Sequence, residues 1–296
     1  MPHFSVIIPT LHSKTLARTL AALQQQTVGA SNIEVIVVGM DLDLKSGEWG
    51  EFYPTEQPLP PGAARNRGAS NAGGEIFAFI DSDCIPAPDW LAVLAERFTD
   101  PQITVVGGGV TFSAENYWAL ADNISMFHDY LSSLPPGERE QLPSLNLAIR
   151  RQVFLEGGGF DNHRRTGEDS DLTIRLKEHG HALYFEPCAI VQHAPHRNRA
   201  VDFFRHHFLH GLHSVKFDPR YTKRGVERFL GNPWALLAVS PVLAVGITAK
   251  IFFENKYLWH YWYTAPAIGA AKLIWCFGAV LRLARSTVAP DKMRDL

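Results

Sequence analysis

The feature that most constrains the fold is an alternation of short apolar runs with helical segments over the first 80 residues. The runs at 4–9, 33–39 and 76–80 are continuous and rich in β-branched and aromatic residues, as in strands that are buried on both faces of a parallel sheet. Leucines at helical spacing follow the first run, and small residues at 64–72 precede the third. Strand, helix, strand, helix, strand predicts an α/β domain with a mostly parallel sheet.

Asp81-Ser82-Asp83 directly follows the third run. In an open parallel sheet ligands bind beyond the carboxyl ends of the strands, where Thr10 and Asp41 also fall. Two carboxylates one residue apart offer hard oxygen ligands to Mg²⁺ or Mn²⁺, which leave positions open for substrate phosphates. An Asp-x-Asp is also common in turns and at helix starts. Its place at the end of a buried strand favours the metal site.

Two arginines, Arg65 and Arg67, lie in a small-residue segment upstream at 62–69. A guanidinium group suits a diphosphate because its planar array of donors matches phosphate oxygens. A metal and an arginine beside one diphosphate predict an enzyme that makes a nucleoside diphosphate a better leaving group.

Acidic residues Glu168, Asp169 and Asp171 precede a predicted helix at 172–179. Acids at a helix N-terminus are an ordinary capping and dipole arrangement, so some of them can be structural. Their mutual repulsion could also raise a carboxylate pKa and produce a general base, a role that Glu168 and Asp169 fit equally well. Arg175 is expected to pair with Asp171 at i,i+4.

Composition narrows the class of protein. A chain of 296 residues can bury a large core in one main domain with an appendage. A net charge of −2 provides no basic field for nucleic acid. The cysteines, at 84, 188 and 276, fit neither a disulfide framework nor a Cys-x-x-Cys metal site, in keeping with a reducing compartment. The N-terminus lacks the pattern of a signal peptide, so we expect that the catalytic part is not exported.

Several ordered motifs together resemble the family 2 glycosyltransferases with the GT-A fold, a Rossmann-like nucleotide-binding fold. The resemblance covers roughly residues 4–215, and it divides the chain into a catalytic domain at 1–215 and a helical hairpin region at 216–296. The matching segments are Ser5-Val6-Ile7-Ile8-Pro9-Thr10, Pro61-Gly62-Ala63-Ala64-Arg65-Asn66-Arg67-Gly68, Phe79-Ile80-Asp81-Ser82-Asp83, Gly158-Gly159-Phe160-Asp161 and Gly167-Glu168-Asp169-Ser170-Asp171-Leu172.

The resemblance implies an inverting transfer of one sugar from a nucleotide-diphosphate-sugar to an acceptor hydroxyl, with Mn²⁺ or Mg²⁺ as cofactor. By the family pattern Asp83 would bind the metal and Asp169 would be the general base, with Glu168 as its rival. His193, which ends a predicted strand, would be a further metal ligand, and a surface or capped histidine is the alternative. The residues expected to bind the donor are Pro9, Thr10, Asp41, Arg65, Arg67, Asp81 and Ser82.

Two departures from the family bear on specificity. The family usually carries acidic residues directly after the second strand, where they read the nucleotide base, whereas this chain has Gly39 and Met40 before Asp41. The sequence therefore does not select UDP, GDP or dTDP. No Gln-x-x-Arg-Trp follows Asp169, which favours addition of single sugars over processive synthesis.

Beyond residue 233 the chain becomes markedly apolar. The stretches 234–253 and 261–280 are each long enough to cross a hydrocarbon core, although Lys272 interrupts the second. We expect Lys272 to face a partner helix, or that helix to lie shallowly. The segment 201–209 mixes aromatic and basic residues, as in a helix at a membrane surface or one packed on the catalytic domain. The alternative for the hairpin is a buried helical pair in a soluble subdomain.

Basic residues flank the hairpin on both outer sides, and the positive-inside rule then places both of its ends in the cytoplasm. These residues are Lys216, Arg220, Lys223, Arg224 and Arg228 before it, with Arg282 and Arg285 after it.

The sequence thus predicts a metal-dependent glycosyltransferase of the cell inner membrane whose catalytic domain faces the cytoplasm. Its partners would be a nucleotide-sugar donor and a glycan or lipid-linked acceptor in the synthesis of a cell-surface polysaccharide or glycolipid. A nucleotidyltransferase is one alternative, but residues 9–14 lack the glycine- and lysine-rich triphosphate loop expected of it. A non-catalytic membrane scaffold of the same fold is another. It would be marked by loss of the aspartates that this chain retains at 81, 83 and 169.

Overall fold

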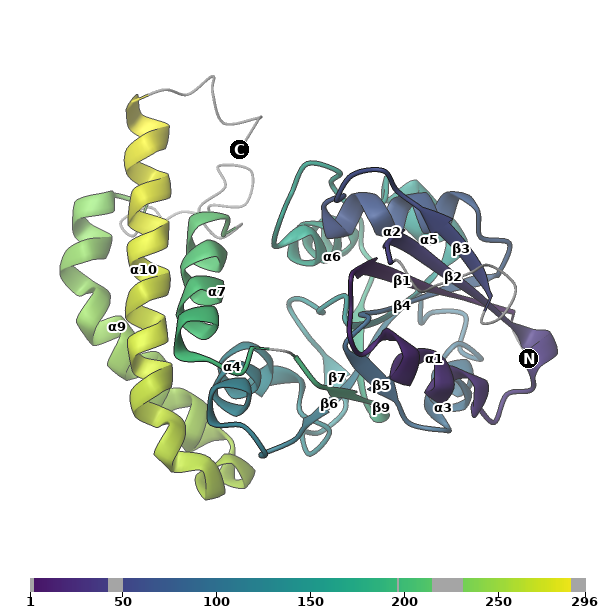
Figure 1. Cartoon of the computed structure of the whole chain (residues 1–296), viewed down its shortest axis with the longest axis horizontal. Coiled ribbons are helices and arrows are strands. Elements are labelled where there is room, and N and C mark those ends of the chain that lie inside the picture. The colour runs from purple at the N-terminus through teal and green to yellow at the C-terminus, as the bar shows by residue number, and fades with distance from the viewer. Residues whose placement is uncertain (1–2, 42–49, 196, 215–230, 289–296) are drawn as a thin grey trace. The chain divides into compact units, whose positions relative to one another are not determined.

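The computed structural model describes residues 3–41, 50–195, 197–214 and 231–288 (Figure 1). Contacts between Cα atoms divide the chain into two compact units. Unit 1 comprises residues 1–113, 129–164 and 168–195, and unit 2 comprises residues 114–128, 165–167 and 196–296.

Unit 1 is built on one mixed sheet with the strand order β3-β2-β1-β4-β8-β6-β9-β5, and β7 pairs with β9. Strands β1 to β4 run parallel to one another, β8 is antiparallel to β4 and β6, and β6 is parallel to β9. The strands are β1 (Phe4–Leu11), β2 (Ile33–Met40), β3 (Glu51–Pro54), β4 (Ile76–Ile80), β5 (Cys84–Pro86), β6 (Val105–Phe112), β7 (Gly137–Glu138), β8 (Asn146–Arg150) and β9 (Leu183–His193).

Helices cover both faces of this sheet (Figure 1). Because β1 and β4 are buried on both faces, they read as continuous apolar runs rather than alternating ones. Ile7, Phe77 and Phe79 pack on one face in a core shared with α2, α5 and α6. The helices of unit 1 are α1 (Leu16–Gln24), α2 (Pro61–Ser70), α3 (Trp90–Arg97), α5 (Arg151–Glu156) and α6 (Glu168–Glu178), with 3₁₀ turns η1 (Ala30–Asn32) and η2 (His128–Tyr130), the latter at the junction of the two units.

The strand order contains a topological switch that locates the site. Strands β2 and β3 lie on one side of β1, and β4 lies on the other. In open α/β sheets such a reversal leaves a crevice beyond the carboxyl ends of the strands, where ligands bind. Thr10 near the end of β1 and Asp81 just after β4 flank this point. The predicted α/β class is therefore confirmed, and the predicted site edge coincides with the switch.

Unit 2 is helical. Its helices are α4 (Tyr117–Phe127), α7 (Ala200–Leu212), α9 (Pro233–Glu254), the 3₁₀ segment η4 (Lys256–Thr264) and α10 (Ala265–Val288). Two helical stretches are long and apolar enough to cross a membrane: Pro233–Glu254, with a mean hydropathy of 2.0, and Lys256–Arg285, with 1.6. The side chain of Asn232 caps α9 by accepting hydrogen bonds from the backbone N–H groups of Trp234 and Ala235.

The sequence predicts a domain boundary between residues 215 and 216. That boundary, together with the basic residues predicted before the hairpin (Lys216 to Arg228), lies outside the described residues. The helix at Ala200–Leu212, expected at a membrane surface or packed on the catalytic domain, packs against α10 within unit 2.

Close approach of backbones fixes the crossing of α7 and α10. A Cβ atom added at Gly211 would lie 2.0 Å from the carbonyl oxygen of Trp275, and one added at Gly278 would lie 2.3 Å from that of Phe208. Two glycines thus let the helices touch through their main chains. Lys272 was expected either to face a partner helix or to belong to a helix that lies shallowly. It faces a helix, because its amine donates to the carbonyl oxygen of Ser125 in α4 at 3.0 Å.

Gly211→Ala should destabilise the protein by about 1–3 kcal/mol, because backbone atoms of α10 occupy the space of the new methyl group. Gly246→Ala is the matched control, since a Cβ atom at Gly246 of α9 meets nothing within 4 Å among the described residues. The control should be neutral or stabilising by up to about 1 kcal/mol through helix propensity. Thermal unfolding in detergent measures both, and equal melting temperatures would disprove the close crossing.

Candidate functional site

The segment Asp81-Ser82-Asp83 forms a tight turn between β4 and β5. The backbone N–H of Cys84 donates to the carbonyl oxygen of Asp81 at 3.0 Å, which closes the turn. Hydroxyl groups of α1 and the loop before it hold the middle of the turn. Three of them donate to the carbonyl oxygen of Ser82, from Ser13 at 3.1 Å, Thr15 at 3.0 Å and Thr19 at 3.2 Å. Since a carbonyl oxygen has only two lone pairs, three donors restrict its orientation and that of the aspartates beside it.

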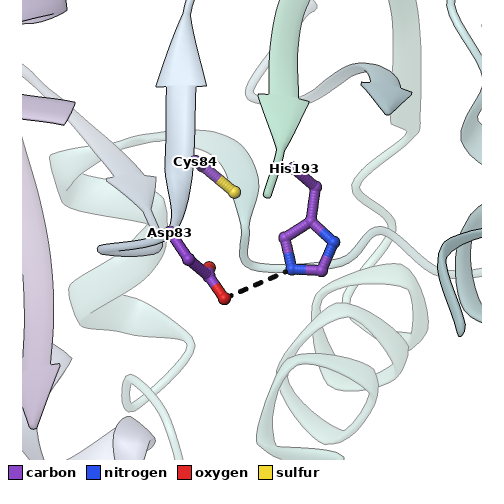
Figure 2. A group of neighbouring side chains, drawn as sticks. All are labelled: Asp83, Cys84 and His193. Carbon is purple, nitrogen blue, oxygen red and sulfur yellow. Dashed lines mark ion pairs between the residues drawn. The ribbon is translucent and has the colours of Figure 1, made fainter. Parts of the chain in front are cut away.

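Asp83 and His193 are brought together by strand pairing. Strands β5 and β9 are antiparallel with Cys84 opposite His193, so the residue before β5 lies beside the end of β9. The backbone N–H of Ala194 donates to the carbonyl oxygen of Asp83 at 2.8 Å and secures the junction. Figure 2 shows the carboxylate and the imidazole turned toward each other, with 3.5 Å between Asp83 Oδ2 and His193 Nε2. A carboxylate and an imidazole at this separation fit a divalent cation.

Cys84 is a third member of this group that the sequence did not indicate. One ligand atom each from Asp83, Cys84 and His193 lies within 4.8 Å of the others. Burial, reinforced by the charges of Asp83 and Asp81, raises the pKa of the Cys84 thiol well above its usual value. A protonated thiol is a poor metal ligand, so the carboxylate and imidazole remain the better donors.

Arg65 joins the two acidic ends of the site. Its side chain is buried, and its two terminal nitrogens donate to Asp81 Oδ1 at 2.5 Å and to Glu168 Oε1 at 2.7 Å. Its Nε atom has no partner among the described residues. Arg65 therefore binds two carboxylates in this structure, whereas the sequence suggested that it faces a diphosphate. Arg67 is exposed and donates to the carbonyl oxygen of Pro54 at 3.3 Å.

The two candidate bases occupy the first turn of α6. Asp169 accepts hydrogen bonds from the backbone N–H of Ser144 at 3.1 Å and from that of Ser170 at 2.7 Å. Burial raises the pKa of Asp169. Burial and the neighbouring charge of Asp169 raise the pKa of Glu168 to about 7, although Arg65 opposes the shift. Both carboxyl groups therefore hold protons more tightly than free ones do.

Asp171 has a structural role. Its carboxylate pairs with Arg175 at 2.9 Å, as the i,i+4 spacing predicted. Arg175 also donates to the carbonyl oxygen of Gly159 at 2.6 Å, in a turn where Gly158 and Gly159 have positive φ. Asn66 of α2 holds the same loop by donating to the carbonyl oxygen of Phe160 at 2.7 Å. These bonds bring α2 and α6 together and so set the position of Arg65 against Glu168.

The end of β1 provides a polar group for a ligand. The hydroxyl of Thr10 is buried and has no partner among the described residues. Opposite it, Gly39 has φ +141°, and a Cβ atom there would lie 1.9 Å from the carbonyl oxygen of Thr10. No side chain fits at this position in this backbone conformation. Asp41 is the first carboxylate after β2.

A family model described as glycosyltransferase like family 2 matches residues 2–207. The chain belongs to this family. Among curated relatives, this family 2 glycosyltransferase is 32% identical over 189 residues to the pre-mycofactocin glycosyltransferase of Mycobacterium tuberculosis, a match covering 60% of this chain and 40% of the relative. It is 29% identical over 204 residues to the glycosyltransferase AglE of Haloferax volcanii, covering 65% of this chain and 67% of the relative. The match thus spans less than half of the mycobacterial protein.

Solved structures support the same fold for the glycosyltransferase. The mannosyltransferase PcManGT from Pyrobaculum calidifontis, determined in complex with GDP-Man and Mn²⁺, aligns with a TM-score of 0.60 at 17% identity. The alignment covers 98% of this chain and 88% of the neighbour. At this identity the likeness shows the GT-A fold alone.

Arg65→Met should destabilise the glycosyltransferase by about 3 kcal/mol, because it leaves Glu168 and Asp81 without their shared cation. The pKa of Glu168, already raised, should rise further. A raised carboxyl pKa disfavours folding above the unfolded-state value in both proteins, so the difference in stability between them should grow as pH rises through about 7, the folded-state pKa in the wild type.

Arg67→Met is the matched control, since Arg67 is exposed and pairs only with a backbone carbonyl in the contacts seen here. Chemical denaturation at several pH values measures both variants. Equal, pH-independent losses for the two would contradict the buried bridge.

Proposed function

We propose that this glycosyltransferase transfers one sugar from a nucleotide-diphosphate-sugar to an acceptor hydroxyl with inversion at the anomeric carbon, and that it requires Mn²⁺ or Mg²⁺. The observation that carries the proposal is the bridge from Asp81 through Arg65 to Glu168. This bridge links the turn that would hold the metal to the helix that would supply the base. Inverting transfer needs both at one reacting centre.

Asp83 and His193 are the proposed metal ligands. Their facing oxygen and nitrogen atoms, and the buried position of His193, support this assignment. A bound cation would neutralise charge on the departing diphosphate. The Mn²⁺ named with the structural neighbour PcManGT supports the same choice of ion. Asp81, held by Arg65, would accept hydrogen bonds from the donor's ribose or sugar.

Asp169 is the proposed general base. Glu168 is more deeply buried and already accepts a hydrogen bond from Arg65, so it is poorly placed to take a proton from the acceptor. Asp169 accepts only backbone hydrogen bonds in the contacts seen here, and its raised pKa increases its basicity. The proton of the acceptor hydroxyl would move to Asp169 as the oxygen attacks.

The nucleotide is proposed to lie at the carboxyl ends of β1 and β2. Pro9 and Thr10 would contact it from β1, with the unpartnered hydroxyl of Thr10 as a hydrogen-bonding group. Asp41 would contact the nucleotide base, and Ser82 would contact the donor from the turn at 81–83. Arg67 of α2 would interact with a phosphate group of the donor.

A membrane acceptor is the best match to unit 2. Large apolar side chains of α9 are exposed, with 76% for Trp234, 71% for Val245 and 74% for Phe253. Exposed apolar side chains of this kind are compatible with contact to the hydrocarbon of a lipid bilayer. We therefore propose attachment to the cell inner membrane with the catalytic unit on the cytoplasmic side. The acceptor would be a lipid-linked or cell-surface glycan that receives single sugars, since no Gln-x-x-Arg-Trp follows the base.

Two substitutions test the roles of metal and base. Asp83→Ala should abolish metal-dependent stabilisation by a nucleoside diphosphate, together with turnover. Asp169→Asn should keep that stabilisation and lose about 10²–10⁴-fold in transfer rate. Glu96→Gln, at an exposed position of α3, is the control and should behave as wild type.

The measurement begins with a thermal-shift screen of UDP, GDP, dTDP and CMP, each with Mn²⁺, Mg²⁺ or EDTA, and continues with transfer assays using the sugar donor of the nucleotide that binds. If no nucleotide stabilises the protein, the proposed donor class is wrong. If Asp169→Asn transfers normally, Asp169 is not the base.

The hydroxyl groups that donate to the carbonyl oxygen of Ser82 give a second prediction. Thr15→Val removes one donor to the Ser82 carbonyl at little change in volume. Losing this hydrogen bond should weaken Mn²⁺ binding by about 1 kcal/mol, because the turn is less well oriented. The Mn²⁺ concentration for half-maximal activity should then rise about fivefold. The rate at saturating Mn²⁺ should change less, and Thr15→Ser should restore the wild-type requirement. An unchanged Mn²⁺ requirement would show that these bonds do not position the metal turn.

A further inference from the structure

Unit 2 contains a buried polar cluster that the proposed transfer reaction does not use. Asp122 of α4 is fully buried, and its Oδ1 atom lies 2.7 Å from His206 Nδ1 and 3.4 Å from His207 Nε2. Both histidines belong to α7. One ligand atom from each of the three residues lies within 4.8 Å of the others. A carboxylate and two imidazoles on two packed helices form a typical set of metal ligands.

His207 has an unsatisfied nitrogen that points into this cluster. Its side chain is 1% exposed, and its Nε2 atom has no hydrogen-bond partner among the described residues. A polar atom without a hydrogen bond in the interior destabilises the folded state. Arg197 and His206 pair closely with the carboxylate of Asp122, whereas His207 Nε2 lies 3.4 Å from it and makes no hydrogen bond among the described residues.

One oxygen of the Asp122 carboxylate faces the two histidines, and the other faces Arg197. Arg197 donates to Oδ2 of Asp122 at 2.6 Å, which leaves Oδ1 for an ion and fixes the carboxylate from outside.

We propose that Asp122, His206 and His207 bind one Zn²⁺ ion that ties α4 to α7. Ligand atoms on one tetrahedral zinc lie about 3.3 Å apart, close to the 3.4 Å between His207 Nε2 and Asp122 Oδ1. His206 would move outward by about 0.6 Å from its hydrogen bond to reach the same spacing. Three protein ligands leave a fourth position for water.

The test measures metal content and does not depend on sugar transfer. The full chain is purified in detergent with Asp83→Ala in the background, which removes the proposed catalytic metal, and zinc is measured by mass spectrometry after dialysis. We expect about one zinc per chain. Asp83→Ala combined with His207→Gln should lose it. His210→Gln in the same background is the matched control, because His210 lies one turn beyond His206 and is not among the three donors.

A second measurement covers variants that fail to fold. The chelator-treated chain carrying Asp83→Ala alone is titrated with Zn²⁺, which should raise its melting temperature, and with Co²⁺, which should give the visible absorption of a four-coordinate site. Absence of zinc after purification, together with no shift of the melting temperature, would overturn the proposal. Full zinc retention in a folded His207→Gln protein would overturn it as well.

Discussion

The candidate site depends on one buried guanidinium group. Arg65 lies in α2 and bonds to Asp81 after β4 and to Glu168 at the start of α6, two residues that are 87 positions apart in the chain. Glu168 is buried, and a buried carboxylate needs such a partner to remain charged. The same contact sets the distance between the turn at Asp81-Ser82-Asp83 and the start of α6. Gly62 allows it, because a Cβ atom there would lie 2.8 Å from the carbonyl oxygen of Asp161 and would push α2 away.

Much of this arrangement follows from local sequence. The continuous apolar runs of β1, β2 and β4 identify central strands of a parallel sheet, and the residues after them must then share one edge. That reasoning correctly predicted the α/β class, and the residues that it expected at the ends of the strands lie at the topological switch of the sheet. It missed elements that lack a strong pattern. The short strand β3 has no apolar run, and the helix α4 falls in the segment 113–143, whose mixed composition suggests a loop.

Contacts that depend on register between distant segments could not be derived from local pattern, although the family resemblance named both Asp83 and His193 as metal ligands. His193 meets Asp83 only because β5 and β9 pair antiparallel with Cys84 opposite His193, and nothing in either segment specifies that pairing. Likewise, the sequence predicts Arg65 as a cation suited to phosphate, because its two carboxylate partners are known only from the packing of α2. The cluster around Asp122 is of the same kind, because α4 itself was not predicted. Motifs therefore indicate which residues matter, and packing decides what each one binds.

The two long helices of unit 2 differ in a way that composition hides. Both are long and apolar enough to cross a membrane. In α9, however, 22% of the most apolar stretch is buried, compared with 44% in the segment that contains α10. The difference has a physical cause. α10 packs on α7 through glycine contacts and on α4 through the amine of Lys272, so part of its surface already has protein neighbours. A charged side chain within an apolar helix requires such neighbours. It follows that α9 leaves more of its apolar surface uncovered by the described residues, while α10 joins α9 to the other helices of the same unit.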